Sequence, residues 1–491
     1  MLFNSLTFMT FLGVIVVLYY LIPHRLRWIL LLLGSYYFYM SWKPTAAIYL
    51  VAATLVAYFC GLGISRTKSG SSARKTFLLV GVLVNLGMLC IFKYFDFLSI
   101  ELESLLKNYN LIPEVFAFPQ LNFLMPVGLS FFTFSVVSYL FDVYRGKMDS
   151  EEHIGRFGVY VAFFPKIFAG PIERAQTFLP QLKKHVRFDP KNITPGLQLI
   201  LWGLFKKVVI ADRLAPFVTQ AFSRPAYSPP LELIIGVYFF AFQLYCDFSG
   251  YTDIARGIAK LLGFDLMENF KRSYLSKSTS EFWAKRWHIS LATWFRDYLY
   301  IPMGGSRVSW PRHYINLMAT FVVSGLWHAG MGYGVSWSFM VWGALNGFYQ
   351  WVSVATAPLR QKLGSIFPKA GDNPFLNVIR VLFTFHLITF AWIFFRANTT
   401  SDAFTIIKRI YNSLGMLPKL LKIYPFTSEL LISFALIATL IFVEILDERK
   451  SIWERIRTKP AFVRWAVYFA LIFSLLILGK WGLAEFIYMS F

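Results

Sequence analysis

The chain has 491 residues, of which 57% are hydrophobic and only 15% charged, and its formal net charge is +22. Because soluble globular proteins carry about 25% charged residues, this composition excludes an ordinary soluble protein and indicates a polytopic membrane protein. The basic residues gather in short loops between apolar runs, which is typical of membrane topology rather than of nucleic-acid binding. The three cysteines are too few for a disulfide framework or a zinc site, and we expect no metal.

The first part of the chain, residues 1–145, is predicted to form roughly five membrane-spanning helices. The run at residues 8–22 lacks both a basic leading segment and a small-residue cleavage site, so a retained helix is expected rather than a signal peptide. The loop at residues 65–76 carries basic residues and no acid, and we therefore expect it to be cytoplasmic. Counting spans from this loop places the N-terminus and the acidic stretch 96–114 outside.

The middle part, residues 146–355, contains three stretches that are too polar to cross lipid and too aromatic for ordinary loops: 163–191, 199–215 and 282–307. Polar or irregular backbone is tolerated at membrane depth only where protein or a water-filled cavity surrounds it. We therefore expect re-entrant or interfacial helices that line a cavity. Plain spans are predicted at 316–328 and 335–352.

The last part, residues 356–491, returns to apolar spans. The whole sequence thus predicts an all-α polytopic membrane protein with roughly eleven to thirteen transmembrane helices.

Two of the seven histidines are candidate catalytic residues. His328 lies among apolar and small residues, including Ser324, Gly325 and Gly330, which leave room for close helix packing or for a ligand. Ionisable groups inside a membrane are costly and usually functional, and an imidazole exchanges protons near neutral pH; a packing histidine is the alternative. His288 lies in a segment that mixes cations with aromatic residues.

The other five histidines are weaker candidates. Of these, His386 lies within a span, and a bond to a carbonyl on a neighbouring helix and a functional role both stay open for it. The other four lie in loops and are expected to face solvent or headgroups: His24, His153, His185 and His313.

The segment around His288 is strongly basic. Between Lys271 and Arg312 there are eight basic residues and two acidic ones. Such a patch suits anionic lipid headgroups, as an interfacial belt would, and it suits a phosphorylated substrate equally well. The candidate substrate-binding residues, with Asn269 added from the segment that precedes them, are Lys285, Arg286, Trp287, Arg296, Tyr300 and Asn269.

Four long motifs resemble the bacterial branch of the membrane-bound O-acyltransferases: residues 124–147, 163–182, 245–307 and 324–330. The resemblance extends from about residue 1 to 480, and it implies a ring of helices around a central tunnel. It places the family's buried catalytic histidine at His328 and its second motif position at His288. For Asn269 it implies no role beyond shaping the cavity.

The resemblance also implies a reaction. Acetyl-CoA would be the donor, bound only as a substrate, with its phosphates held at the cytoplasmic face by Lys285, Arg286 or their neighbours. The acetyl group would pass across the cell inner membrane to a separate extracytoplasmic partner with a serine-hydrolase-like fold. That partner would O-acetylate an exported, alginate-like polysaccharide.

Three alternatives stay open at this point. D-alanyl transfer to teichoic acid would use a carrier protein as donor. A transporter would explain broken helices and a buried histidine, and a scaffold of a polymer-export complex would need no catalytic histidine.

Overall fold

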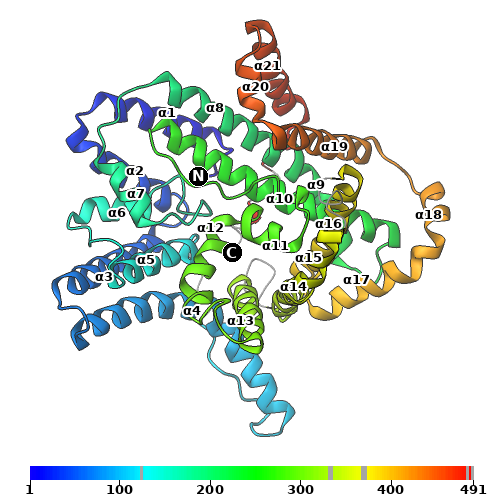
Figure 1. Cartoon of the computed structure of the whole chain (residues 1–491), viewed down its shortest axis with the longest axis horizontal. Coiled ribbons are helices and arrows are strands. Elements are labelled where there is room, and N and C mark those ends of the chain that lie inside the picture. Colours follow the sequence, from blue (N-terminus) through cyan, green and yellow to red (C-terminus); the bar gives the residue numbers. More distant parts are fainter. Residues whose placement is uncertain (122–124, 330–335, 367–372, 483–485, 488–491) are drawn as a thin grey trace.

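The computed structural model describes residues 1–121, 125–329, 336–366, 373–482 and 486–487. Gly330 and Val335, which the sequence placed in a small-residue motif and at the start of a span, lie outside the described residues. Within these ranges every regular element is helical. Figure 1 shows α1–α7 gathered at one side, α10 and α12 through the middle, and α14–α18 on the other side.

The N-terminal helices form one side of the body, and α4 is by far the longest of them at 37 residues. Their bounds are α1 Leu6–Leu21, α2 Arg27–Met40, α3 Ala47–Arg66, α4 Ser72–Asn108, α5 Leu129–Tyr144, α6 Ile154–Ala162 and α7 Ala175–Lys183.

The central helices are interrupted by π-helical turns, which are rare and often occur at functional sites. The α-helices are α8 Pro190–Leu204, α9 Asp212–Ser223, α10 Pro230–Leu261, α11 Thr279–Glu281, α12 Ile289–Phe295, α13 Trp310–His328 and α14 Ser338–Ala355. The π-turns are η3 Phe205–Ala211, η5 Phe282–Arg286 and η6 Arg296–Tyr300.

The C-terminal helices complete the body and end with α21, of which only 6% is buried within the protein. Their bounds are α15 Ala357–Ile366, α16 Pro374–Arg396, α17 Thr400–Ser413, α18 Leu417–Ile423, α19 Ser428–Arg449, α20 Ile452–Arg457 and α21 Ala461–Leu478.

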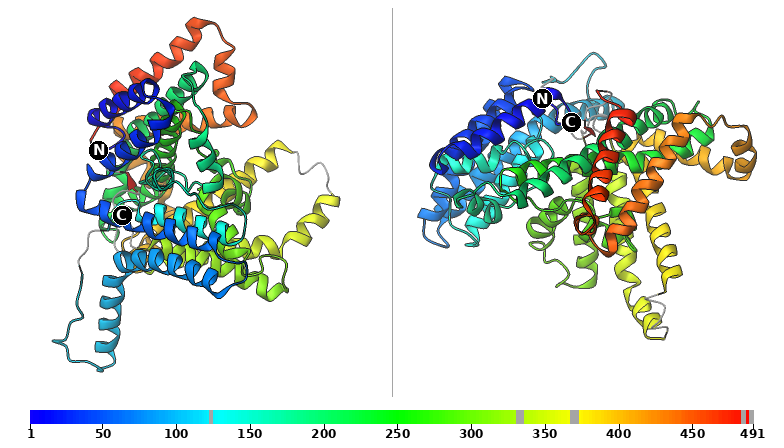
Figure 2. Two further views of the ribbon diagram at one scale, coloured as in Figure 1. Left: turned by 90° about the vertical axis from the view of Figure 1, so that its left-hand side faces the viewer. Right: turned by 90° about the horizontal axis from the view of Figure 1, so that it is seen from above.

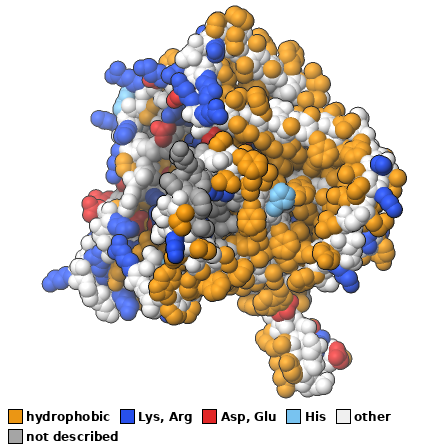
Figure 3. All heavy atoms as spheres, turned by 45° about the vertical axis from the view of Figure 1, so that its right-hand side comes forward, with side chains coloured by type: hydrophobic (Ala, Val, Ile, Leu, Met, Phe, Trp, Pro, Cys, Tyr) orange, Lys and Arg blue, Asp and Glu red, His pale blue; other side chains and the backbone are white. Residues whose placement is uncertain are grey.

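By length and composition, seven helical stretches among the described residues could cross a membrane. Two shorter apolar helices, α1 and α5, accompany them. These helices confirm an all-α polytopic membrane protein, while the number of passes stays a prediction. Figure 3 shows the broad hydrophobic surface that such a protein presents to lipid, with Lys and Arg at its margins.

One of the seven stretches corrects the sequence analysis. Residues 199–215 were expected to be too polar to cross lipid, yet they lie inside the continuous helical stretch Pro190–Ser223. Its cations do not face lipid, because Lys206 pairs with Asp253 at 2.7 Å and Lys207 pairs with Asp212 at 2.8 Å. Because these buried cations are paired with carboxylates, they do not prevent the segment from lying within the membrane.

The acidic end of α4 and the basic helix α15 lie on opposite faces of the body. In the right-hand view of Figure 2, the end of α4, which contains the acidic stretch, and α15 project from opposite sides of the body. α15 carries Arg360 and Lys362 and no acid. This arrangement agrees with an acidic outer face and a basic inner face.

Candidate active site

A cavity of about 240 Å³ brings both candidate catalytic histidines together. α13 supplies one wall, and the segment from α11 to η6 supplies another. Of the residues predicted from the sequence, five line it: Trp287, His288, Arg296, Tyr300 and His328.

The wall from α13 follows the helical repeat. Leu317, Thr320, Phe321, Ser324 and His328 are spaced at intervals of three or four residues and so share one face of the helix. At a rise of about 1.5 Å per residue, the cavity wall extends about 16 Å along α13. His328 is the last residue of the helix and lies at the deep end.

The open end of the cavity lies on the face that carries the predicted cytoplasmic loop. The side chain of Arg296 is 58% exposed there, whereas His288 and His328 are both buried. The next residue, Asp297, accepts a hydrogen bond on its backbone carbonyl from Arg145 at 3.1 Å. The carbonyl of Tyr144 accepts one from Arg74, at the start of α4, at 2.9 Å.

His328 is enclosed by aromatic rings. Its ring centroid lies 4.6 Å from Trp327, 5.1 Å from Trp342 and 5.2 Å from Phe395. It also lies within electrostatic range of His288 and Lys93. An imidazole enclosed by these rings is shielded from bulk water, so it is placed to exchange a proton with a substrate in the cavity rather than with solvent.

α4 caps the helix end that carries His328. The ammonium of Lys93 donates to the backbone carbonyl of Trp327, and the hydroxyl of Tyr94 donates to that of Leu326 at 2.8 Å. The last carbonyls of a helix lack partners within the helix and carry its negative dipole end, so a cation stabilises them. No role was predicted for Lys93, although a lone lysine directly after the apolar run that ends at Phe92 was a signal.

The backbone of His288 is held in an uncommon conformation. It adopts a left-handed conformation with φ 44°, which is unusual for a residue other than glycine, and it immediately precedes α12. The backbone N–H of Ile289 donates to the carbonyl of Asn269 at 2.9 Å. Such strain persists only where the surroundings enforce it, and it is common at active sites.

The side chain of Asn269 fixes the tautomer of His288. Its Oδ1 accepts the backbone N–H of Ser290 at 3.1 Å, which assigns this atom as the oxygen. His288 Nδ1 lies 3.1 Å from the same oxygen and must therefore be the protonated nitrogen. A neutral His288 then carries its lone pair on Nε2. Asn269 thus positions a candidate catalytic residue, which goes further than the cavity-shaping role that the sequence suggested.

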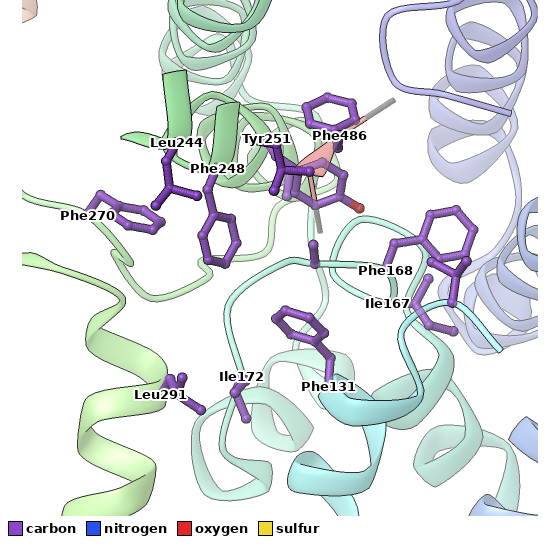
Figure 4. Close-up of a cluster of buried hydrophobic side chains, with 14 of the residues drawn as sticks. Phe131, Ile167, Phe168, Ile172, Leu244, Phe248, Tyr251, Phe270, Leu291 and Phe486 are labelled. Atoms are coloured by element: carbon purple, nitrogen blue, oxygen red, sulfur yellow. The ribbon is translucent and has the colours of Figure 1, made fainter. Parts of the chain in front are cut away.

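Phenylalanines from three segments hold the ring of His288. Its centroid lies 4.7 Å from Phe248 of α10, 6.3 Å from Phe131 of α5 and 6.1 Å from Phe270. Figure 4 shows these three side chains within one buried hydrophobic cluster. The second histidine is therefore as firmly placed as the first.

Of the small residues near His328, one allows close helix packing and another lines the cavity. A Cβ at Gly325 would lie 2.4 Å from the carbonyl oxygen of Phe339, and one at Gly343 would lie 2.5 Å from that of Phe321. Gly325 therefore allows α13 and α14 to pack closely. Ser324, by contrast, lines the cavity.

The three basic residues that were predicted to bind the substrate differ in burial and in their ion pairs. Arg286 is buried and already paired, since its Nε lies 2.7 Å from Glu281 and its Nη2 lies 2.6 Å from Glu448. Lys285 is exposed, and neither residue lines the cavity. Arg296 is thus the cation that the structure brings to the cavity wall.

None of the other five histidines lines this cavity, although the ring of His313 lies 6.3 Å from that of Tyr300, which does. His386 bonds a carbonyl at 2.7 Å, but that carbonyl belongs to Leu382 on its own helix rather than to a neighbouring helix. His153 precedes α6 and accepts the N–H of Arg156 at 3.2 Å, and the rings of His24 and His185 lie 5.1 Å apart. Within the described ranges, no cluster of three or more His, Cys, Asp or Glu could hold a metal ion.

Comparison with known proteins identifies the family. The model of the membrane-bound O-acyltransferase family matches residues 153–396, a range that contains both histidines and all the residues that line the cavity. A probable alginate O-acetylase, AlgI, of Azotobacter vinelandii is 36% identical over 415 residues, which cover 84% of this chain and 78% of that protein. The chain belongs to the membrane-bound O-acyltransferase family.

Two further relatives carry different names. The peptidoglycan O-acetyltransferase of Helicobacter pylori is 32% identical over 77% of this chain and 72% of that protein. The teichoic acid D-alanyltransferase of Bacillus subtilis is 24% identical over 56% of this chain and 70% of that protein. The protein is therefore an O-acyltransferase of the membrane, and the names of these relatives refer to three different polymers, namely alginate, peptidoglycan and teichoic acid.

Proposed function

We propose that this O-acyltransferase takes acetyl groups from cytoplasmic acetyl-CoA and delivers them across the inner membrane for the O-acetylation of an exported, alginate-like polysaccharide. The observation that carries this proposal is a single cavity with an exposed arginine at its open end and two buried histidines at its deep end. Arg296 suits the phosphates of the donor, and the narrow apolar wall of α13 suits the chain that bears the thioester.

His328 acts as general base in this proposal. It removes the proton of an acceptor hydroxyl as the oxygen attacks the thioester carbonyl, so that a carbon–oxygen bond forms and the carbon–sulfur bond breaks. The imidazolium then returns the proton to the departing thiolate, which leaves as free CoA. Such base catalysis contributes about 10²–10⁴-fold, and the alignment of donor and acceptor in the cavity supplies the remainder.

His288 supports this reaction from the adjoining wall. Because Asn269 accepts the proton on Nδ1, the neutral ring offers Nε2 as an acceptor. We assign it a hydrogen bond to the acceptor hydroxyl or to the CoA portion, and the general-base step stays with His328.

The acceptor side of the proposal involves a separate extracytoplasmic partner with a serine-hydrolase-like fold. It rests on the family resemblance and on the names of the relatives, in which alginate and peptidoglycan O-acetylation appear. D-alanyl transfer from a carrier protein is the second candidate, because a D-alanyltransferase is also similar to this chain. The higher identity of the O-acetylating relatives favours acetyl transfer.

Release of free CoA from acetyl-CoA by the purified chain in lipid tests the donor and the base together. We expect slow release by the wild type, faster release with the partner, and loss of release in His328→Ala. His386→Ala is the matched control, since it removes an exposed histidine on α16. If His328→Ala released CoA as fast as the wild type, the general-base assignment would be wrong; if the wild type with its partner released none, acetyl-CoA would be the wrong donor.

A further inference from the structure

A second cavity, of about 310 Å³, lies between α8, α10, α19, α20 and α21. It is separate from the catalytic cavity, and the two share no lining residue. A thin aromatic layer divides them, because Phe270 lines the second cavity while its ring lies 5.0 Å from Trp287, which lines the first.

The polar wall of the second cavity is balanced in charge. It contains four basic and four acidic residues, namely Lys206, Arg256, Lys271, Arg272, Asp253, Glu268, Glu444 and Asp447. They alternate in space: Asp253 lies 2.7 Å from Lys206 and 3.4 Å from Arg256, and Arg256 lies 4.0 Å from Glu268. A highly anionic molecule such as CoA would meet as many repelling as attracting groups here, whereas a ligand with one charge of each sign would be matched.

The opposite wall is apolar and faces the membrane. It contains Leu199 and Trp202 from α8, Val443 from α19, and Val467 and Leu471 from α21. Since only 6% of α21 is buried within the protein, its other faces are open to lipid. A ligand in this cavity can therefore place an apolar chain along α21 while its polar end remains inside.

The cavity lies at the depth of lipid headgroups. α20, which contributes Trp453 to its wall, carries Arg455 and Arg457 in its last turn. Tryptophan together with basic residues is typical of the membrane–water interface. The ring of Trp453 also stacks on Tyr468 of α21 at 6.4 Å, which joins the polar and apolar walls.

We propose that this cavity binds a zwitterionic phospholipid with a primary amine, of the phosphatidylethanolamine class. Arg256 and Lys271 hold its phosphate, and Asp253 and Glu268 accept hydrogen bonds from its ammonium. Arg272 stays paired with Asp447 and Glu448 and completes the wall. A primary ammonium offers three donors to carboxylates, whereas a choline group offers none and is recognised by aromatic cages. The acyl chains lie against α8 and α21.

Native mass spectrometry of the delipidated full-length protein tests the proposal. The protein is titrated with dioleoyl phosphatidylethanolamine, phosphatidylglycerol or phosphatidylcholine, and separately with glycerophosphoethanolamine, the soluble headgroup. We expect one tightly retained phosphatidylethanolamine, weaker retention of the other two lipids, and little binding of the soluble headgroup. Equal retention of all three lipids, or a soluble headgroup that binds as tightly as the lipid, would overturn it.

Two variants test the residues. Glu268→Gln removes one ammonium partner from a side chain that is 45% exposed, and we expect the preference for phosphatidylethanolamine over phosphatidylglycerol to fall about tenfold. Glu454→Gln is the matched control, because it removes an exposed carboxylate of α20 that does not line the cavity. An unchanged preference in Glu268→Gln, or an equal loss in both variants, counts against the site.

Discussion

The ammonium of Lys93 donates to the backbone carbonyl of Trp327, the residue that directly precedes His328. The two residues are 234 positions apart in the chain. This contact ties the long helix α4 to the end of α13, and so to the position of the proposed general base. Because Lys93 contacts the helix end rather than the substrate, it is a positioning residue.

Replacing Lys93 with Met should therefore lower kcat for CoA release while leaving KM for acetyl-CoA nearly unchanged. The loss of the cation removes the ammonium that donates to the carbonyl of Trp327, and a displacement of about 1 Å at a catalytic group costs about 10²-fold. Steady-state kinetics of the purified variant in lipid would measure this. Lys75→Met, which removes an exposed lysine of the same helix, is the control. A rise in KM at constant kcat would show that Lys93 acts on binding instead.

Substitutions of Asn269 should separate the tautomer of His288 from the packing around it. Asn269→Leu removes the oxygen that accepts from His288 Nδ1 and from Ser290, and we expect at least a tenfold loss of CoA release. Asn269→Asp retains that oxygen and should keep more activity than the leucine variant. Activity assays paired with thermal unfolding would check this, and equal losses in the two variants would contradict a tautomer-fixing role.

Much of the fold followed from the sequence because long apolar runs and basic loops report directly on membrane spans. His328 could be singled out because ionisable groups inside a membrane are costly and usually functional, and His288 because cations and aromatic residues surround it in the sequence. Lys93 and Asn269 could not be given their roles, since their partners lie 234 and 19 positions away and no sequence periodicity places either pair in contact. The polar span at 199–215 was misjudged for the same reason, because Asp253, which neutralises Lys206, belongs to another helix.

The crossing of α13 and α14 gives a prediction about stability. An alanine at Gly325 would place its Cβ 2.4 Å from the backbone oxygen of Phe339, which a flexible side chain cannot relieve. We expect Gly325→Ala to destabilise the protein by about 1–3 kcal/mol and to reduce activity, because α13 must move and carries His328 with it. Thermal unfolding in detergent and CoA release would measure both effects. Gly87→Ala is the control, since nothing lies within 4 Å of the added Cβ, and equal losses in the two variants would contradict the close-packing argument.

Substitutions of Arg296 and Arg286 should have different effects, the first on KM for acetyl-CoA and the second on stability. Arg296 lines the open end of the cavity and is largely exposed, so Arg296→Gln should raise KM for acetyl-CoA about tenfold through the loss of a charged hydrogen bond to phosphate, with little change in unfolding temperature. Arg286 is buried between Glu281 and Glu448. Arg286→Gln leaves Glu281 without this cation and Glu448 with Arg272 as its remaining partner, and it should lower the unfolding temperature instead. Kinetics at two salt concentrations would complete the comparison, because the contribution of Arg296 is screened by salt and that of Arg286 much less. A raised KM in Arg286→Gln with normal stability would show that the phosphates bind at Arg286 after all.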